Sequence, residues 1–168
     1  MTHPLVTQLR FARAEWLRAL ADIPPEDARR RLLPMNSISW IAAHLAWHEQ
    51  SNWLYRAQGK ILVPAVIELG GYGKPPSAPP LDEMLEAWRT ITAAADLYLD
   101  ALTTAEMQSH WTVKGKPAAA DIGTTLLRVI YHYWYHTGEI MAIRQMLGHP
   151  NLPEFVGDID TQAPYQPE

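Results

Sequence analysis

Two histidines four residues apart, His132 and His136, are the first side chains in this sequence with the spacing of a metal site. On an α-helix they lie on one face with Cβ atoms about 6 Å apart, so both imidazoles can reach one ion. The same face carries Val129 and Ile140, which indicates that the pair points toward a core. The pattern alone also fits two imidazoles satisfied by hydrogen bonds in a polar seam.

A second segment brings further histidines to an inward helix face. On a helical wheel His44, His48 and Tyr55 share one stripe there. Buried imidazoles without partners cost free energy, whereas one divalent ion satisfies several of them at once. Three or four histidines that converge from two helices are hard to explain as core filling, so the constellation favours a metal site.

Two other kinds of metal chemistry lack their motifs. Carboxylate-bridged di-iron sites need Glu-x-x-His motifs on paired helices, but Glu139 follows its histidine and Glu49 projects about 140° away from His44. The His48-Glu49 dipeptide has no second His at the offset of a His-Glu-x-x-His zinc protease. We therefore expect one ion, and nothing supports peptide hydrolysis.

Composition limits the class of protein. The 168 residues carry 14 Lys and Arg against 18 Asp and Glu, a net charge of −4, so there is no basic field for nucleic acid. The chain has no Cys, which removes disulfides, Cys-ligated zinc and a thiol nucleophile of its own. It shows no basic and apolar leader and no uncharged apolar run of about 18 residues. We expect a soluble cytoplasmic protein that binds neither nucleic acid nor membranes.

The fourteen prolines define the elements that must position the histidines. An interior Pro costs a helix about 3 kcal/mol, so long helices are expected only in Pro-free windows. Apolar periodicity within these windows predicts four helices. Their expected ranges are 5–23, 36–59 with Asn36 or Ser37 as the cap, 81–102 and 123–147. Four such helices predict an all-α four-helix bundle.

The remaining segments are expected to be connections. Residues 60–80 begin apolar but are interrupted by Gly and Pro, which predicts a long loop between the second and third helices, or a lid, with no helix of its own. The bundle is expected to occupy residues 1–150 as one domain. Residues 151–168 are expected to form an extended polar tail.

The two histidine segments resemble those of the DinB/YfiT-like family of proposed metalloenzymes. The run from His132 through His136 to Gly138 and Glu139 is similar to its pattern His-x-x-x-His-x-Gly-Gln/Glu. The run His44-Leu-Ala-Trp-His-Glu is similar to its His-Leu/Ile-x-x-x-Glu segment. The resemblance spans the chain in length and helix order. It implies one divalent ion, commonly zinc or nickel, on His44, His132 and His136, with open positions for water or substrate.

The resemblance also implies a class of chemistry. Relatives with known activity use low-molecular-weight thiols such as bacillithiol or mycothiol, as thiol transferases or isomerases. Such a cosubstrate would bring the nucleophile that a chain without Cys lacks, and the metal would stabilise its thiolate. The first hypothesis is therefore a thiol transferase or a hydrolase. The alternative is a metal-binding or ligand-binding bundle without catalysis, in which the ion is structural.

Three further side chains have open roles. His48 departs from the matched motif, and it is a fourth ligand, a residue that orients a ligand, or a general base; a fourth ligand would favour the structural role of the ion. Tyr55 is the inward polar candidate for a substrate pocket walled by one or two of the tryptophans on these helices, which are Trp40, Trp47, Trp53 and Trp134. His48 and Tyr55 are thus the candidate catalytic residues. Glu139 either orients a metal ligand or is an exposed helix carboxylate.

The last helix carries a second apolar stripe opposite its histidines. This stripe consists of Leu127, Ile130, Trp134, Gly138 and Met141. A simple bundle turns that face to solvent, where long apolar stripes are uncommon. Either the chain's own 60–69 segment or tail covers it, or a second copy does, and the sequence predicts a homodimer with Trp134 as the anchor.

Overall fold

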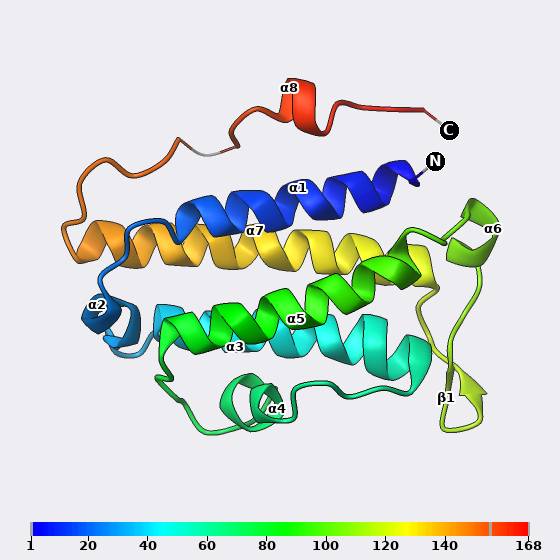
Figure 1. Ribbon diagram of the computed structural model, residues 1–168, viewed down its shortest axis with the longest axis horizontal. Helices are drawn as coiled ribbons and strands as arrows, with labels where there is room; N and C mark the ends of the chain where they lie inside the picture. The colour runs from blue at the N-terminus through cyan, green and yellow to red at the C-terminus, as the bar shows by residue number, and fades with distance from the viewer. Residues whose placement is uncertain (1, 155, 168) are drawn as a thin grey trace. The chain divides into compact units, whose positions relative to one another are not determined.

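The computed structural model describes residues 2–154 and 156–167, which divide into two compact units. Unit 1 is built from Met1–Ala21 and Asp100–Glu168, and unit 2 is Asp22–Leu99. Figure 1 labels their elements. The all-α class is confirmed, because four long helices dominate the described chain and its only strands are two residues long.

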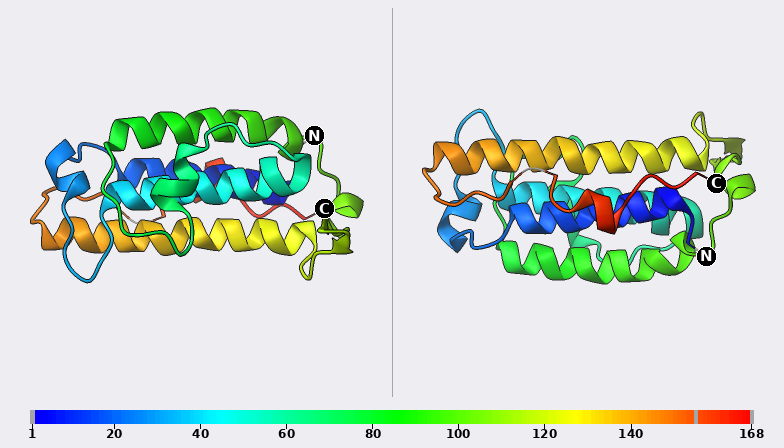
Figure 2. Two further views of the ribbon diagram at one scale, coloured as in Figure 1. Left: turned by 90° about the horizontal axis from the view of Figure 1, so that it is seen from below. Right: turned by 90° about the horizontal axis from the view of Figure 1, so that it is seen from above.

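In unit 1, helices α1 (Pro4–Ala19) and α7 (Ile122–Met146) lie side by side (Figure 2). The His3 ring caps α1 by accepting from the Leu5 amide at 3.1 Å, and the Asp121 carboxylate caps α7 by accepting from the Thr124 amide at 2.6 Å. Helix α7 ends before Gly148, whose φ of +76° suits a residue without a Cβ. Fully buried side chains form the core: Val6, Leu9, Trp16, Leu126, Val129, Tyr133 and Ile140.

The rest of unit 1 departs from the sequence prediction in two places. Between the long helices lie α6 (Thr104–Met107) and an antiparallel hairpin of β1 (Thr112–Val113) and β2 (Lys116–Pro117), which was not predicted. The tail is not extended throughout, because it contains one helical turn, α8 (Ile159–Gln162). The Gln8 side chain donates to the Ala163 carbonyl at 2.7 Å and so fixes this turn to α1.

In unit 2, helix α3 (Ile38–Glu49) packs against α5 (Leu81–Leu99), with α2 (Pro25–Arg29) and α4 (Ala65–Gly70) also in contact with α3. The Ser37 hydroxyl caps α3 by accepting from the Trp40 amide at 3.1 Å. The buried side chains of this unit include Ile41, Leu45 and Ile91, which are fully inaccessible to solvent. The expected second and third helices are therefore present, the third ending at Leu99.

The second helix changes its winding after Glu49. Residues Gln50–Arg56 form a π-helix, η1, in which the backbone bonds span five residues instead of four. The wider turn rotates the following side chains away from the positions that an α-helical wheel gives them. Tyr55 is 58% exposed, so the expectation that it points inward beside His44 is wrong.

The segment expected to be a loop without a helix contains α4. Its Val66 side chain is fully buried. The Gln50 side chain accepts from the amides of Leu62 and Val63, both at 2.8 Å, and donates to the Val63 carbonyl at 3.0 Å. Gln50 thus fastens the segment to the end of the helix that carries His44. The Gly and Pro residues limit α4 to six residues but do not prevent it.

The second apolar stripe of α7 does not face solvent as expected. The Trp134 ring is half-buried and packs on Phe11 of α1, with ring centroids 6.0 Å apart, and Ile130 is buried. The exposed aromatic residues of α7 are instead Tyr131 and Tyr135. Part of the stripe is therefore covered by α1, whereas Gly138 is exposed, and the homodimer stays a prediction.

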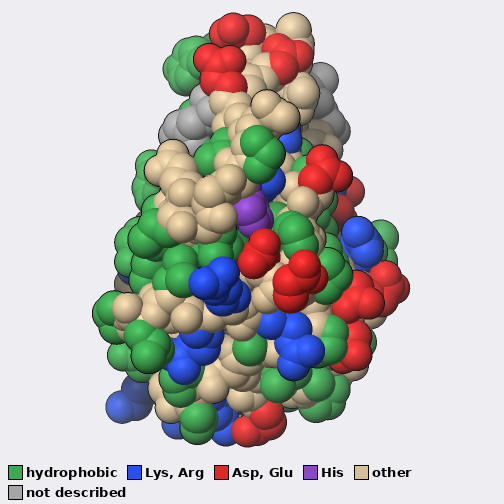
Figure 3. Space-filling view, turned by 90° about the vertical axis from the view of Figure 1, so that its left-hand side faces the viewer, with side chains coloured by type: hydrophobic (Ala, Val, Ile, Leu, Met, Phe, Trp, Pro, Cys, Tyr) green, Lys and Arg blue, Asp and Glu red, His purple; other side chains and the backbone are tan. Residues whose placement is uncertain are grey.

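The surface in view in Figure 3 carries charged, other polar and apolar side chains. No helix in the described part of the chain is both long and apolar enough to cross a bilayer. On the face in Figure 3, Lys and Arg side chains alternate with Asp and Glu side chains and with apolar patches.

Candidate metal centre

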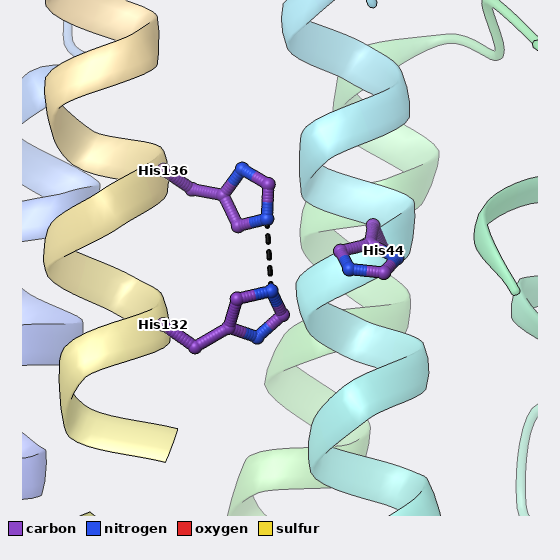
Figure 4. A group of neighbouring side chains, drawn as sticks. All are labelled: His44, His132 and His136. Carbon is purple, nitrogen blue, oxygen red and sulfur yellow. Dashed lines mark hydrogen bonds between the residues drawn. The ribbon is translucent and has the colours of Figure 1, made fainter. Parts of the chain in front are cut away.

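Helix α7 directs His132 and His136 toward each other. Their Nε2 atoms are 2.9 Å apart and face one another, as the dashed line in Figure 4 shows. The spacing of four residues places one ring directly above the other on the helix surface. His136 is 5% exposed and His132 is half-buried, so the pair is largely withdrawn from water.

Glu139 orients the ring of His136. Its Oε2 lies 2.8 Å from the His136 Nδ1, and a carboxylate can only accept, so this nitrogen carries the proton. The other nitrogen, Nε2, is then a bare acceptor that faces His132. A carboxylate behind a histidine is the usual device for presenting the opposite ring nitrogen to a metal. The sequence left open whether Glu139 orients a histidine or is an exposed carboxylate. In the structure it orients the ring of His136.

His44 is held on α3 by two contacts. Its Nδ1 lies 2.7 Å from the carbonyl oxygen of Gly70 at the end of α4, so Nδ1 carries the proton and donates it. The ring of Trp40 is stacked on it, with centroids 4.7 Å apart and planes 10° from parallel. Trp47 contacts the imidazole with a centroid distance of 5.3 Å. The Nε2 of this buried ring is left as an acceptor.

The three histidines form a group of possible ligands. One ligand nitrogen from each of His44, His132 and His136 lies within 4.8 Å of the other two (Figure 4). In the described residues this group does not include His48, which is half-buried one turn further along α3. The resulting donor set is three neutral imidazoles, which suits zinc, nickel and similar ions.

Tyr55 lies beside a different feature, a cavity of about 270 Å³ in unit 2. Its lining includes Trp47, Ser51 and Ile67 and is mostly apolar. Trp47 also contacts the ring of His44, so one side chain joins the cavity to this histidine. The expectation of a pocket walled by a tryptophan and Tyr55 therefore has a physical counterpart on the outer side of the π-helix.

The other histidines serve local structure. His3 caps α1, the exposed His110 bonds to the Ala118 carbonyl at 2.8 Å, and His149 accepts from the Arg144 guanidinium at 3.3 Å. These three histidines lie at helix ends and in loops. The feature that sequence reasoning missed is the Gly70 carbonyl. Its only signal was the Gly70-Gly71 pair, which was interpreted as a helix breaker.

Comparison with known proteins identifies the family. No match was found to any curated protein. The family model described as the DinB superfamily matches residues 8–140, which include all three grouped histidines and most of each long helix. The chain therefore belongs to the DinB superfamily.

Proposed function

We propose that this protein is a metal-dependent enzyme in which His44, His132 and His136 bind one divalent ion, zinc or nickel. The observation that carries the proposal is the facing pair of Nε2 atoms on α7. Two nitrogens bound to the same zinc at about 2.1 Å in a tetrahedron lie about 3.3 Å apart. The 2.9 Å separation needs only a small ring rotation to reach that value.

The hydrogen bonds of the proposed ligands support a metal site more strongly than a polar seam in which the imidazoles are satisfied by hydrogen bonds alone. His136 and His44 each hold a proton on Nδ1, toward Glu139 and the Gly70 carbonyl, and so the Nε2 of each is unprotonated. In the absence of an ion, one proton between His132 and His136 satisfies that pair. A cation at the same place satisfies three acceptors at once, which a single proton cannot do.

The chemistry of the proposed enzyme follows from this donor set. When bound, a zinc or nickel ion would supply the positive charge that stabilises the anion of water or of a thiol. The chain has no Cys, so a thiol nucleophile must come from a low-molecular-weight cosubstrate. The protein's own residues hold the ligand rings in place and shield them, with Trp40 covering one face of His44.

Two side chains are proposed to act on the substrate. His48 lies one turn from His44 on the same helix and is proposed as a general base, since a neutral imidazole nitrogen can accept a proton. Tyr55 is proposed to contact the organic part of the substrate in the cavity that it lines with Trp47. The reaction is thiol transfer or hydrolysis, and the bound thiol or water is the nucleophile.

The alternative is a bundle in which the ion is purely structural. Structural zinc sites close the tetrahedron with four protein ligands, whereas catalytic sites keep one position open. The group of possible ligands in the described residues has three members, which supports the enzyme. A fourth protein ligand found with metal present, such as His48, would support the alternative.

Metal content of the purified protein, before and after incubation with zinc or nickel, tests the proposal. We expect one ion per chain by elemental analysis, with anomalous scattering from it between the three imidazoles. Turnover of a thiol with a model electrophile, present with the metal and absent after chelation, then separates the enzyme from the structural alternative. No bound metal after incubation with either ion would contradict both.

The oligomeric state of the protein and its location in the cell stay predictions. The homodimer that the sequence predicts is tested by sedimentation. The cytoplasmic location is compatible with a chain without Cys, which needs no disulfide.

A further inference from the structure

The segment that leaves the π-helix and returns to α5 is fixed to α3 at two places. Gln50, 1% exposed, holds the backbone of Leu62 and Val63. After α4, the Ser77 hydroxyl donates to the Leu69 carbonyl at 2.6 Å, and the Ser77 carbonyl accepts from the Ser37 hydroxyl at 3.1 Å. Helix α4 is therefore held in one position against α3.

At its C-terminal end, α4 approaches the backbone of α3 more closely than any side chain permits. A Cβ on Gly70 would lie 2.4 Å from the Ala43 carbonyl carbon and 2.4 Å from the His44 amide nitrogen. Both atoms belong to the α3 backbone, so they cannot move aside as the end of a flexible side chain could. Glycine is required here for space, not for an unusual φ.

This close approach delivers one carbonyl oxygen to His44. The last carbonyls of a helix have no partner inside it and must find one elsewhere. The Leu69 carbonyl is taken by Ser77, and the Gly70 carbonyl lies 2.7 Å from the His44 Nδ1. A carbonyl only accepts, so the bond selects the ring form that carries its proton on Nδ1.

We infer that Gly70 is a positioning residue that presents Nε2 of His44 as a ligand. Two contacts act together on the ring. The stacked Trp40 side chain fixes the plane of the imidazole, and the Gly70 carbonyl fixes its rotation within that plane and its tautomer. The role of Nε2 toward a metal rests on the proposed function. The Nδ1–H tautomer follows from the hydrogen bond alone.

The tautomer is measured in the metal-free protein, labelled with ¹⁵N at its histidines, by long-range ¹H–¹⁵N spectra. The signals of His44 are assigned by their loss in a His44→Asn variant. We expect the Nδ1–H form at this residue. An Nε2–H form would overturn the inference, and neither result depends on whether a metal binds. A role of Gly70 in packing alone would not select a tautomer.

The second measurement is zinc affinity by competition with a chelator in the Gly70→Ala variant. The added Cβ must push α4 away from α3 and lengthen the bond to His44, so we expect affinity about 10- to 100-fold below the wild type. Gly138→Ala is the matched control, because a Cβ there meets nothing within 4 Å. A folded Gly70→Ala variant with wild-type affinity would overturn the inference but leave the proposed function standing. A wild type that binds no zinc but has His44 in the Nδ1–H form would contradict the proposed function and leave the assignment of the tautomer to the Gly70 carbonyl intact.

Discussion

The protons on the imidazole rings decide what each histidine can do. Glu139 fixes the proton of His136 on Nδ1, and the Gly70 carbonyl does the same for His44. His132 instead faces the Nε2 of His136. Without an ion, the pair on α7 needs a proton between the two Nε2 atoms. An ion has to displace that proton, so metal binding by this site includes proton release.

Replacing His132 with Ala should remove a ligand and the partner of His136 together. Zinc at 100 times its Kd stabilises the wild type by about 2.7 kcal/mol, and the variant should lose most of this increment. The measurement is the thermal shift with and without zinc. The control is His110→Ala, because His110 is exposed and its ring bonds to the Ala118 carbonyl of a loop, away from the three grouped histidines. Equal shifts in both variants would refute the ligand assignment.

Glu139→Gln tests the carboxylate behind His136. The amide oxygen can still accept from Nδ1, but without the negative charge that makes the imidazole a better donor to a metal. We expect zinc affinity to fall about 10-fold, measured by chelator competition. Glu86→Gln on α5 is the matched control, since its side chain is 74% exposed and only 3.7 Å from Arg89 in a surface ion pair. A Glu139→Gln variant with unchanged affinity would show that the negative charge of Glu139 does not strengthen His136 as a ligand.

Among the elements, the tail depends on one ion pair of α1. Arg18 donates to both carboxylate oxygens of Glu15 at 2.6 and 3.0 Å and also to the Glu154 carbonyl. The same carboxylate accepts from the Gly157 amide at 2.8 Å. Two backbone groups of the tail are thereby fixed to a single pair of charged side chains.

This clamp predicts a pH-dependent stability. The hydrogen bond from Arg18 holds the pKa of Glu15 below its usual value of 4.5, against the opposing effect of burial. A carboxyl with a lowered pKa stabilises the fold above its unfolded pKa and loses that contribution as the pH falls through the folded value. The Glu15→Gln variant should be about 1–2 kcal/mol less stable than the wild type at pH 7. Unfolding in urea should show this difference shrinking below pH about 4.5; a difference that stays constant down to pH 3 would contradict the clamp.

The long helices were predictable because proline and apolar periodicity act locally. Ser37 was one of the two expected caps and is the cap, and the last helix, expected over 123–147, spans Ile122–Met146. The switch to the π-helix at Gln50 was not predictable, because seven residues are too few for apolar periodicity to distinguish the two windings. That error misplaced Tyr55 and no histidine, since His44 precedes the switch.

Helix α4 escaped prediction for a different reason. Its six residues are too few to show a period, and the helix depends on Gln50 and Ser77, which are distant in sequence. The grouped histidines were named from spacing and resemblance, which indicate which side chains share a face. The Gly70 carbonyl could not be named, because every residue has a carbonyl and only the fold selects this one.

On the scale of the whole molecule, the open question is what covers the second apolar stripe of α7. The sequence assigned the stripe to a partner copy, with Trp134 as the anchor. In the structure Trp134 packs on Phe11, which is 3% exposed, and the end of α7 is fixed to α1 by a bond of 2.7 Å from Arg144 to the Ala19 carbonyl. The structure thus gives Trp134 a partner within its own chain.

Trp134→Glu separates the two assignments. If the contact with Phe11 is the main one, the charge enters the packed seam between α1 and α7, and the free energy of unfolding should fall by about 2–4 kcal/mol, or roughly 4–16 °C in Tm. The sedimentation coefficient should then equal that of the wild type, and zinc binding by the folded protein should persist. Tyr131→Glu is the matched control, because Tyr131 is 65% exposed on the same helix and should tolerate the charge with little change in Tm. A wild type that sediments as a dimer at micromolar concentration, and a Trp134→Glu variant that sediments as a monomer with unchanged Tm, would instead place Trp134 in an interface between two copies.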